Sequence, residues 1–477
     1  MPTDEDSRYQ RLPIPEEPAR DRVSSFIEIK HAYPPDEAVI EAQRCLQCAM
    51  PYCVQACPIA QDARGYILAI AQRDFDRAAT VVLRENPLGT TLCKVCYHFC
   101  EDACIMHERG GAIAIRQLKR AAMELGKADV EYVPSAPVSQ RVAIVGAGPA
   151  GLMAAWELGI RGYSVTVYEA EPFLGGQVGA IPKYHMDGYE LELDVARFRR
   201  LDVAFQMGQR LGRDFTLDTL RAAGYRAIYL ALGTPGHNSL GVPGEKLPGV
   251  YAAIDLLTET NKGPPVVLGK KVVVIGGGDV AMDAVRSARR LAEGGDVTVV
   301  YRRGRAEMSA GAEEIEEAEA EGVQFLFDHG PSQIVGNGKV EGIVIRQMQL
   351  SPPGPSGRPV VLPVPGTEQT LACDSVVVAV GEKADLTGFP PELDLAFGKQ
   401  GWPQGKHDDT MTGVDGVFAS GGKSVVHAMA AGTRSAEGVD AYLRKQGGNP
   451  PTPRPDPFGQ GIAPTLPKGY GGPTWTP

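Results

Sequence analysis

The chain has 477 residues, a formal net charge of −10 and an ordinary globular composition, with 43% hydrophobic and 22% charged residues. This length is too great for one hydrophobic core and predicts about three domains. An acidic chain without clustered Lys and Arg excludes nucleic acid and anionic membranes as partners. No secretory signal opens the chain and its apolar runs are only strand-length, so we expect a cytoplasmic protein that does not cross a membrane.

Residues 1–135 hold eight of the nine cysteines, in two continuous quartets among helix-like stretches. Disulfides rarely persist in the cytoplasm, and structural zinc usually draws on two Cys pairs separated by a longer loop. Short spacings and a closing Pro58 are typical of bacterial ferredoxins. The quartets therefore predict two [4Fe–4S] clusters, with structural zinc as the alternative. The candidate ligands are Cys45, Cys48, Cys53, Cys57, Cys93, Cys96, Cys100 and Cys104.

The ninth cysteine, Cys373, opens the apolar strand CDSVVVAV and is predicted to be a small buried residue. It takes no part in the metal prediction.

After a Pro/Ser linker at 133–140 the pattern changes to strand, glycine turn, helix and strand, which is typical of parallel α/β units. In the first unit GAGPAG follows the strand RVAIV. The next strand ends at Glu169, at the offset where a carboxylate accepts hydrogen bonds from ribose hydroxyls. This unit predicts a site for FAD or NAD, formed by Gly146, Ala147, Gly148, Pro149, Ala150, Gly151 and Glu169.

The second unit has the same layout, with GGGDVA after the strand KKVVVI. Its second strand ends in YRRGR instead of an acid. A carboxylate would repel a 2′-phosphate, whereas guanidinium groups bind phosphate at two points. The unit predicts NADPH, with NADH as the alternative, and the alternative for its arginines is a solvated loop. The candidate residues are Gly276, Gly278, Asp279, Ala281, Arg302 and Arg303.

Two dinucleotide sites beside iron–sulfur clusters predict a direction of electron flow. A nicotinamide gives two electrons as hydride, clusters accept one at a time, and a flavin converts between them. The chain is thus predicted to be an NAD(P)H-dependent oxidoreductase. Hydride transfer needs no acid–base side chain, so no catalytic residue is predicted.

Together these motifs closely resemble the small-subunit family of glutamate synthase. Its relatives include the large subunit of NADH-dependent NADPH:ferredoxin oxidoreductase and the amino-terminal part of dihydropyrimidine dehydrogenase. The likeness runs from about Arg11 to Leu443. It covers EAQRCLQCAMPYCVQACPI, GAGPAGLMAA, GGQ at 175–177, LALGT around Gly233, GGGDVAMDAVRSARR, YRRGRAEM and GVFASGG.

The resemblance implies an α/β fold in which a helical iron–sulfur domain, 1–135, precedes two Rossmann-like domains. An FAD domain, 140–265 and 373–445, would be interrupted by an NADPH domain at 266–372, and a Pro/Gly-rich tail, 446–477, would follow. Gly176, Gln177, Gly233 and Gly421 would complete the FAD site. Cys57 would join Cys96, Cys100 and Cys104 on one cluster, while Cys45, Cys48 and Cys53 hold the other.

The chain departs from the family pattern at two places. Relatives complete the three-cysteine cluster with a downstream Glu or Gln, where this chain has Lys119, so Cys93 or, less favoured, Gln117 is expected to supply the fourth bond. Gly422 stands where the family has an Asp that binds the flavin, in a shortened loop. His427 is expected to be a packed helix residue, with contact to the cofactor as the alternative.

The resemblance implies an electron-input subunit that serves a larger catalytic or electron-accepting protein subunit, or ferredoxin. The chain has nothing resembling a glutaminase or FMN domain. The alternatives are an FAD/NADPH module of another redox complex, which works with ferredoxin or a metalloenzyme, and a non-catalytic iron–sulfur scaffold.

Overall fold

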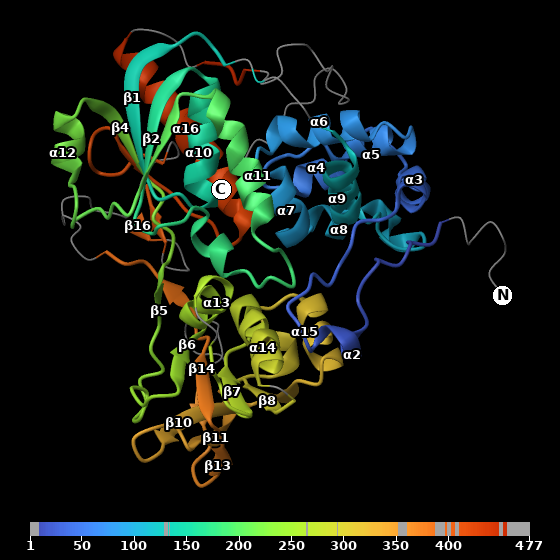
Figure 1. The fold of residues 1–477 in the computed structure, drawn as a ribbon, viewed down its shortest axis with the longest axis vertical. Helices are drawn as coiled ribbons and strands as arrows, with labels where there is room; N and C mark the ends of the chain where they lie inside the picture. The colour runs from blue at the N-terminus through green and yellow to red at the C-terminus, as the bar shows by residue number, and fades with distance from the viewer. Residues whose placement is uncertain are drawn as a thin grey trace.

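The computed structural model of the chain describes residues 9–127, 132, 134–263, 266–292, 294–351, 360–386, 396–397, 402–405, 410–447 and 452–455. Most of the expected tail after residue 446 lies outside the described residues. Figure 1 shows a helical domain in blue, a sheet domain in which green strands meet the red helix α16, and a second sheet domain in yellow and orange. The predicted fold class is confirmed.

The helical domain is a set of short helices around one apolar core. Asp62 and Asp74 start two of them, because their carboxylates accept hydrogen bonds from the N–H groups of Gly65 (2.9 Å) and Arg77 (3.0 Å). All thiols except Cys93 lie in loops or in helices of four or five residues. The elements are α3 (Pro35–Gln43), α4 (Tyr52–Ala56), α5 (Ala63–Ala71), α6 (Phe75–Glu85), α7 (Gly89–Val95), α8 (Phe99–Asp102), η1 (Ile105–Glu108) and α9 (Ile115–Leu125).

The first sheet domain has five strands in the order β18-β4-β1-β2-β3, all parallel. Eleven of the twelve residues of α10 are buried. Helix α16 comes so close to α10 that a Cβ on Gly432 would stand 2.2 Å from the carbonyl oxygen of Ala150. The elements are β1 (Val138–Val145), α10 (Pro149–Ile160), β2 (Tyr163–Glu169), η2 (Gly176–Ala180), α11 (Tyr189–Ala196), η3 (Arg197–Arg200), β3 (Val203–Met207), α12 (Leu217–Ala222), β4 (Tyr225–Leu230), β18 (Val417–Ala419) and α16 (Val425–Gln446).

The second sheet domain also has a five-stranded parallel sheet, in the order β6-β14-β7-β8-β9, and an antiparallel extension. Its parallel unit consists of β6 (Val250–Ala252), α13 (Ala253–Lys262), β7 (Lys271–Ile275), α14 (Asp279–Leu291), β8 (Asp296–Val300), η4 (Arg305–Glu307), α15 (Ala312–Ala320), β9 (Gln324–Leu326) and β14 (Ser375–Val378). The extension consists of β10 (His329–Val335), β11 (Gly342–Leu350), β12 (Val361–Pro363) and β13 (Gln369–Ala372).

Two short strands, β5 (Gly236–His237) and β15 (Glu382–Lys383), pair where the chain leaves the first sheet domain and returns to it. The expected boundaries at 265 and 372 are therefore wrong, because β6 and β14 both belong to the second sheet. A short apolar run such as SVVV does not reveal which of two parallel sheets it joins. Cys373 is 3% exposed, as predicted. The pair β16 (Ala396–Phe397) and β17 (Pro403–Gln404) follows.

The segment before the first thiols ties the helical domain to the second sheet domain. Figure 1 shows its helix α2 (Ala19–Arg22) beside α15. Arg22 pairs with Glu321 (2.9 Å), and Lys30 pairs with Glu317 (2.6 Å). These ion pairs are largely buried, which fixes the two domains relative to each other.

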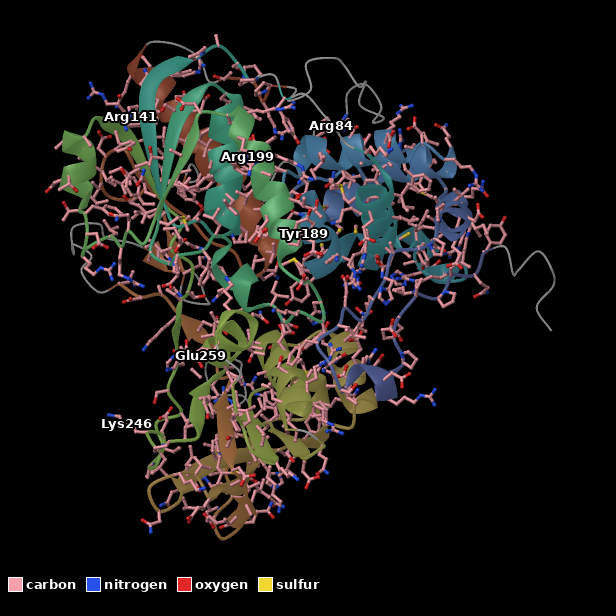
Figure 2. The ribbon with its side chains drawn as sticks, viewed as in Figure 1. Arg84, Arg141, Tyr189, Arg199, Lys246 and Glu259 are labelled. Atoms are coloured by element: carbon pink, nitrogen blue, oxygen red, sulfur yellow. The ribbon has the colours of Figure 1, made fainter. Side chains whose placement is uncertain are left out.

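Arg454 makes a similar link on another side of the molecule. It donates to the carbonyl oxygen of Arg84 on α6 (2.8 Å) and pairs with Glu157 on α10 (2.9 Å). Figure 2 labels Arg84 at the edge of the helical domain that faces the first sheet domain. Among the described helices none is long and apolar enough to cross a membrane.

Candidate functional site

The first glycine turn connects β1 to α10. Gly146 has φ +107°, which favours glycine, and a Cβ on Gly151 would stand 1.9 Å from the Gly146 carbonyl oxygen. No atom lies within 4 Å of a Cβ built on Gly148, so this side of the turn faces open space. At the end of β2 the Glu169 carboxylate accepts hydrogen bonds from the N–H groups of Ala147 (2.7 Å) and Glu171 (2.9 Å). The turn thus presents backbone and an acid to a ligand.

The second glycine turn connects β7 to α14 in the same way, with Gly276 at φ +153°. Arg302 and Arg303 follow β8 and line the adjoining cavity. No hydrogen bond or ion pair joins either guanidinium group to a residue that the structure describes. Arg305, in contrast, pairs with Glu319 and does not line the cavity. Two guanidinium groups without a described partner are suited to binding a phosphate at this position.

One continuous cavity of about 2010 Å³ joins the two turns. The loop between α7 and α8, which contains Cys96, forms part of its wall. Of the predicted dinucleotide residues only Ala147 and Gly151 do not line it, because they lie behind the first turn. Those that do are Gly146, Gly148, Pro149, Ala150, Glu169, Gly176, Gln177, Gly233, Gly276, Gly278, Asp279, Ala281, Arg302, Arg303 and Gly421. A cavity of this size, with both turns in its wall, fits two dinucleotides.

The loop before α16 is remodelled where the family Asp was expected. A Cβ on Gly422 would stand 2.3 Å from the backbone nitrogen of Ala428, so no side chain fits there. Ser424 caps α16 by accepting a hydrogen bond from the N–H of His427, and Gly421 to Val425 line the cavity. The N-terminus of α16 therefore borders the cavity at this point. The His427 ring packs edge-on against Phe99 (5.1 Å between centroids) instead of lining the cavity.

Four thiols gather around a small pocket at the surface of the helical domain. Cys45, Cys48, Cys53 and Cys104 line this pocket, and we call them the first thiol set. Burial, followed by the nearby thiols of Cys45 and Cys104, raises the pKa of Cys53 to about 12. A buried thiol of this kind becomes a thiolate when a metal displaces its proton.

This grouping differs from the expectation that Cys104 would join Cys57, Cys96 and Cys100. The first thiol set is complete with Cys104 and needs no fourth bond from Cys93 or Gln117. Sequence spacing could not show this grouping, because α8, which ends just before Cys104, packs against α4 only in the folded chain.

The remaining cluster candidates, Cys57, Cys96 and Cys100, form a second thiol set. Burial raises the pKa of Cys100, and the thiols of Cys96 and Cys57 raise it further. Tyr66 is fully buried. Burial raises its pKa, and Cys53 of the first set and all three thiols of the second set lie close enough to raise it further. The two sets are therefore neighbours, and the second set borders the dinucleotide cavity through Cys96.

Cys93 stands apart from both sets. Its thiol donates to the carbonyl oxygen of Thr90 (3.0 Å), and it is 1% exposed. Burial raises its pKa to about 12, and no other thiol is among the groups that affect it. The expected role of Cys93 as an iron ligand has no support in this geometry.

The spacing of the thiols does not suit zinc. Tetrahedral zinc, with Zn–S bonds of about 2.3 Å, holds its sulfurs about 3.8 Å apart. Among the described residues, which include all nine cysteines, no three thiols lie within 4.8 Å of one another. A four-iron cluster separates its ligands more widely, so the thiol sets fit such a cluster better than a single ion.

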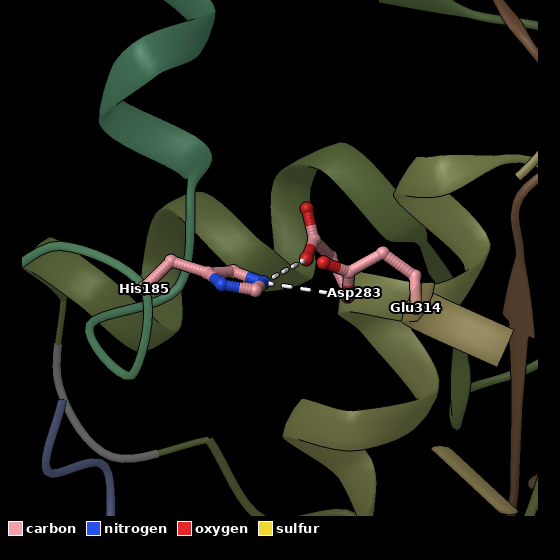
Figure 3. Close-up of side chains that lie close together, drawn as sticks. All are labelled: His185, Asp283 and Glu314. Atoms are coloured by element: carbon pink, nitrogen blue, oxygen red, sulfur yellow. Dashed lines mark hydrogen bonds and ion pairs between the residues drawn. The ribbon is translucent and has the colours of Figure 1, made fainter. Parts of the chain in front are cut away.

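Figure 3 shows His185 pointing toward Asp283 on α14 and Glu314 on α15. The Nε2 atom of His185 lies 3.2 Å from Asp283 Oδ1 and 3.6 Å from Glu314 Oε2. The same Glu314 oxygen pairs with the buried guanidinium of Arg286 (2.6 Å), which would repel a metal ion. Burial alone would raise the pKa of Glu314, but His185 and Arg286 lower it. The group is best described as an ion-pair network that joins the two sheet domains.

Comparison with known families agrees with this fold and cofactor set. Residues 140–436 match the pyridine nucleotide-disulphide oxidoreductase family, and residues 22–130 match the family described as dihydropyrimidine dehydrogenase domain II, 4Fe-4S cluster. FprA of Mycobacterium tuberculosis, solved in complex with NADPH, is 20% identical, with a TM-score of 0.56, over 66% of this chain and 87% of its own. That likeness concerns the fold alone.

Three curated relatives cover most of the chain. The glutamate synthase [NADPH] small chain of Halomonas elongata is 32% identical over 89% of this chain and 95% of its own length. The NADP(+)-dependent formate dehydrogenase subunit beta of Moorella thermoacetica is 36% identical over 84% of this chain. The NADPH-Fe(3+) oxidoreductase subunit beta of Geobacter sulfurreducens is 36% identical over 73%.

The chain spans only 61% and 53% of the lengths of the formate dehydrogenase and Fe(3+) oxidoreductase subunits, whereas it spans nearly all of the glutamate synthase small chain. These matches confirm the predicted resemblance and the predicted cofactor set of FAD, NADP and [4Fe–4S] clusters.

Proposed function

The chain belongs to the glutamate synthase small-subunit family of FAD- and iron–sulfur-containing oxidoreductases, and we propose that it oxidises NADPH and delivers single electrons to a partner protein. The single cavity that joins both glycine turns to the Cys96 loop supports this proposal most directly. When bound, the flavin supplies the conversion of hydride into single electrons and the clusters carry them onward. The side chains of the cavity wall would position these groups.

We assign FAD to the first glycine turn. Glu169 is already held by the backbone of the turn, and its remaining lone pairs would be available to the ribose hydroxyls. Gly148, where an added Cβ would meet no atom within 4 Å, leaves the backbone open to a pyrophosphate. The N-terminus of α16 would take the place of the family Asp beside the flavin.

We assign NADPH to the second glycine turn, in preference to NADH. Arg302 and Arg303 supply the guanidinium groups for a 2′-phosphate, and no described acid neutralises them. Asp279, at the start of α14, accepts a hydrogen bond from the N–H of Gly311 (3.0 Å), which fixes the loop that faces the nucleotide.

We assign one [4Fe–4S] cluster to each thiol set. A cluster on the second set would be the one nearer the flavin, because Cys96 borders the dinucleotide cavity. The buried Tyr66 lies near thiols of both sets. A cluster on the first set, at the surface, would be the one that delivers electrons to a partner. The nine cysteines form no disulfide, which suits a reducing compartment such as the cytoplasm.

The surface around the first set is the proposed docking site of the partner subunit. Leu46, Met50, Tyr52 and Ile105 are between 43% and 59% exposed, and three of them line the same pocket as the thiols. Exposed apolar side chains grouped over an electron-transfer centre suit the core of a protein interface. A partner that docks here brings its own redox centre near the first cluster.

A second candidate partner class follows from the similarities. The higher identity is to subunits of a formate dehydrogenase and an Fe(3+) oxidoreductase, 36% against 32% for the glutamate synthase small chain. The chain is therefore also a candidate for the NADPH module of another metalloenzyme complex, or for exchange with ferredoxin.

The direct test uses the holoprotein, purified anaerobically. We expect about eight irons and eight sulfides per chain and a flavin band near about 450 nm that NADPH bleaches. Intact clusters without flavin would instead identify an iron–sulfur scaffold. Absence of iron and sulfide would contradict the proposal.

The docking surface has its own test. The double variant L46S/Y52S is expected to slow electron delivery to the co-purifying subunit at least tenfold, while NADPH still bleaches the flavin. Ile27, 52% exposed on the amino-terminal segment, provides a matched control, and I27S should change neither rate.

A further inference from the structure

Lys119 on α9 is a buried cation without a partner. Its side chain is 6% exposed, and no hydrogen bond or ion pair joins its ammonium to any residue that the structure describes. The neighbouring cations on the same helix are all paired: Arg116 with Glu313 (3.3 Å) and Arg120 with Glu124 (2.6 Å). An ammonium that has lost most of its hydration is stabilised by a nearby anion. An anion beside Lys119 would supply that compensation.

The groups around Lys119 are thiols. Burial raises the pKa values of Cys57, Cys100 and Cys93, and the charge of Lys119 opposes that rise in each. The Cys93 thiol keeps its proton and donates it in a hydrogen bond to the carbonyl oxygen of Thr90. The two that remain belong to the second thiol set, where iron would hold them as thiolates.

The second thiol set is also one ligand short. The first set has four thiols around its pocket, whereas the second has three. Gln117 is two residues from Lys119, and side chains at this spacing point to different sides of a helix. It lines the dinucleotide cavity, while Lys119 does not. On α9 the Arg116 guanidinium is already bonded to the carbonyl oxygen of Cys96 (3.2 Å), which leaves Lys119 as the cation without a described partner whose charge acts on Cys57 and Cys100.

We propose that Lys119 is the counter-cation of the second cluster, which is held by Cys57, Cys96 and Cys100 without a fourth thiolate. The inference rests on the proposed function, since it requires iron at these thiols. A fixed positive charge favours the reduced cluster, which carries one more negative charge, over the oxidised one. Lys119 therefore raises the reduction potential of the cluster next to the flavin cavity and favours its acceptance of electrons.

The test is a potentiometric titration of the anaerobic holoprotein, followed by electron paramagnetic resonance. In K119M the ratio of reduced to oxidised second cluster at a given potential is expected to fall at least tenfold, which corresponds to about 59 mV for one electron. K119Q should behave like K119M, and K119R should stay within twofold of wild type. The first cluster gives an unchanged reference signal in the same sample. K30M, which removes a paired lysine of low exposure, is the matched control and should not shift the second cluster.

Three results would overturn the proposal. An unshifted second cluster in both K119M and K119Q, with iron content intact, would show that the ammonium does not face it. Loss of about four irons in both K119M and K119R would show that the side chain is an iron ligand rather than a counter-cation. Absence of iron from the wild-type protein would contradict the proposed function itself. This result differs from the first two, so a failure of the function can be told apart from a failure of the Lys119 proposal.

Discussion

The two glycine turns have the same strand–turn–helix layout, yet their surroundings differ in chemistry. The first is followed by a helix, α10, that is buried on nearly every side against α16. The second is followed by α14, whose buried face carries Arg286 and Arg290. These pair with Glu321, which also holds Arg22 of the amino-terminal segment.

The difference shows which parts of a dinucleotide site are general and which are specific. Both turns present backbone N–H groups to a pyrophosphate, which any dinucleotide supplies. The end of the second strand distinguishes the ligand: Glu169 in one unit, Arg302 and Arg303 in the other. The third turn position differs as well. A Cβ on Gly151 would overlap the backbone of Gly146, whereas the Cβ of Ala281 fits in the second turn and is fully buried.

The largest effect is expected from G151A in the first turn. Its Cβ would overlap the carbonyl oxygen of Gly146, which is backbone and cannot move aside. We expect the unfolding free energy to fall by more than about 4 kcal/mol and the bound FAD to be lost. Urea denaturation and flavin content measure this. The matched variant A281G should cost only about 1 kcal/mol, and equal losses in both would contradict the comparison.

The next effect is expected from E321Q below the second turn. Arg22, Arg286 and Arg290 would lose a shared carboxylate, and unfolding free energy at pH 7 should fall by about 3 kcal/mol. Burial alone would raise the pKa of Glu321, but hydrogen bonds from Arg290 and Arg286 lower it to about 2.

The sign of the pH dependence follows from that shift. The folded pKa lies below the unfolded value of 4.5, so this stabilisation is complete above pH 4.5 and is lost as pH falls toward 2. Thermal unfolding between pH 6 and 3 should therefore show a weaker pH dependence in E321Q than in wild type. Parallel curves would contradict the assignment.

A moderate effect is expected from the double variant R302A/R303A. Loss of charge-assisted hydrogen bonds to a 2′-phosphate, each worth about 1.5–3 kcal/mol, should raise KM for NADPH at least tenfold. KM for NADH should change less than twofold, and stability should stay constant because neither arginine has a described partner. R305A, which removes the arginine paired with Glu319, is the control.

The smallest effect is expected from E169Q. The amide retains one oxygen acceptor for the Ala147 N–H but loses the negative charge and the second acceptor. The affinity for FAD should fall by about 1 kcal/mol, or several-fold, as measured by flavin release during dilution. An unchanged affinity would place the ribose elsewhere.

Local pattern predicted the dinucleotide sites better than the thiol sets. Glycine spacing, flanking strands and the terminal acid or arginines all lie within one unit, so the residues that the structure brings to the cavity were visible in the sequence. The thiols belong to two separate segments, 45–57 and 93–104. Their sorting depends on how α4, α8 and α9 pack, which placed Cys104 with the first set and left Cys93 out.

The amino-acid sequence by itself determined the kinds of chemistry: two nucleotide turns, iron-binding thiols, and arginines in place of an acid. These depend on backbone conformation and residue type over short distances. Only the tertiary structure decided which thiols share a pocket, that Gly422 has no room for an Asp, that β6 and β14 join the second sheet, and that Lys119 has low exposure. Each of these depends on contacts between segments far apart in the chain, where packing and lost hydration, rather than local periodicity, set the outcome.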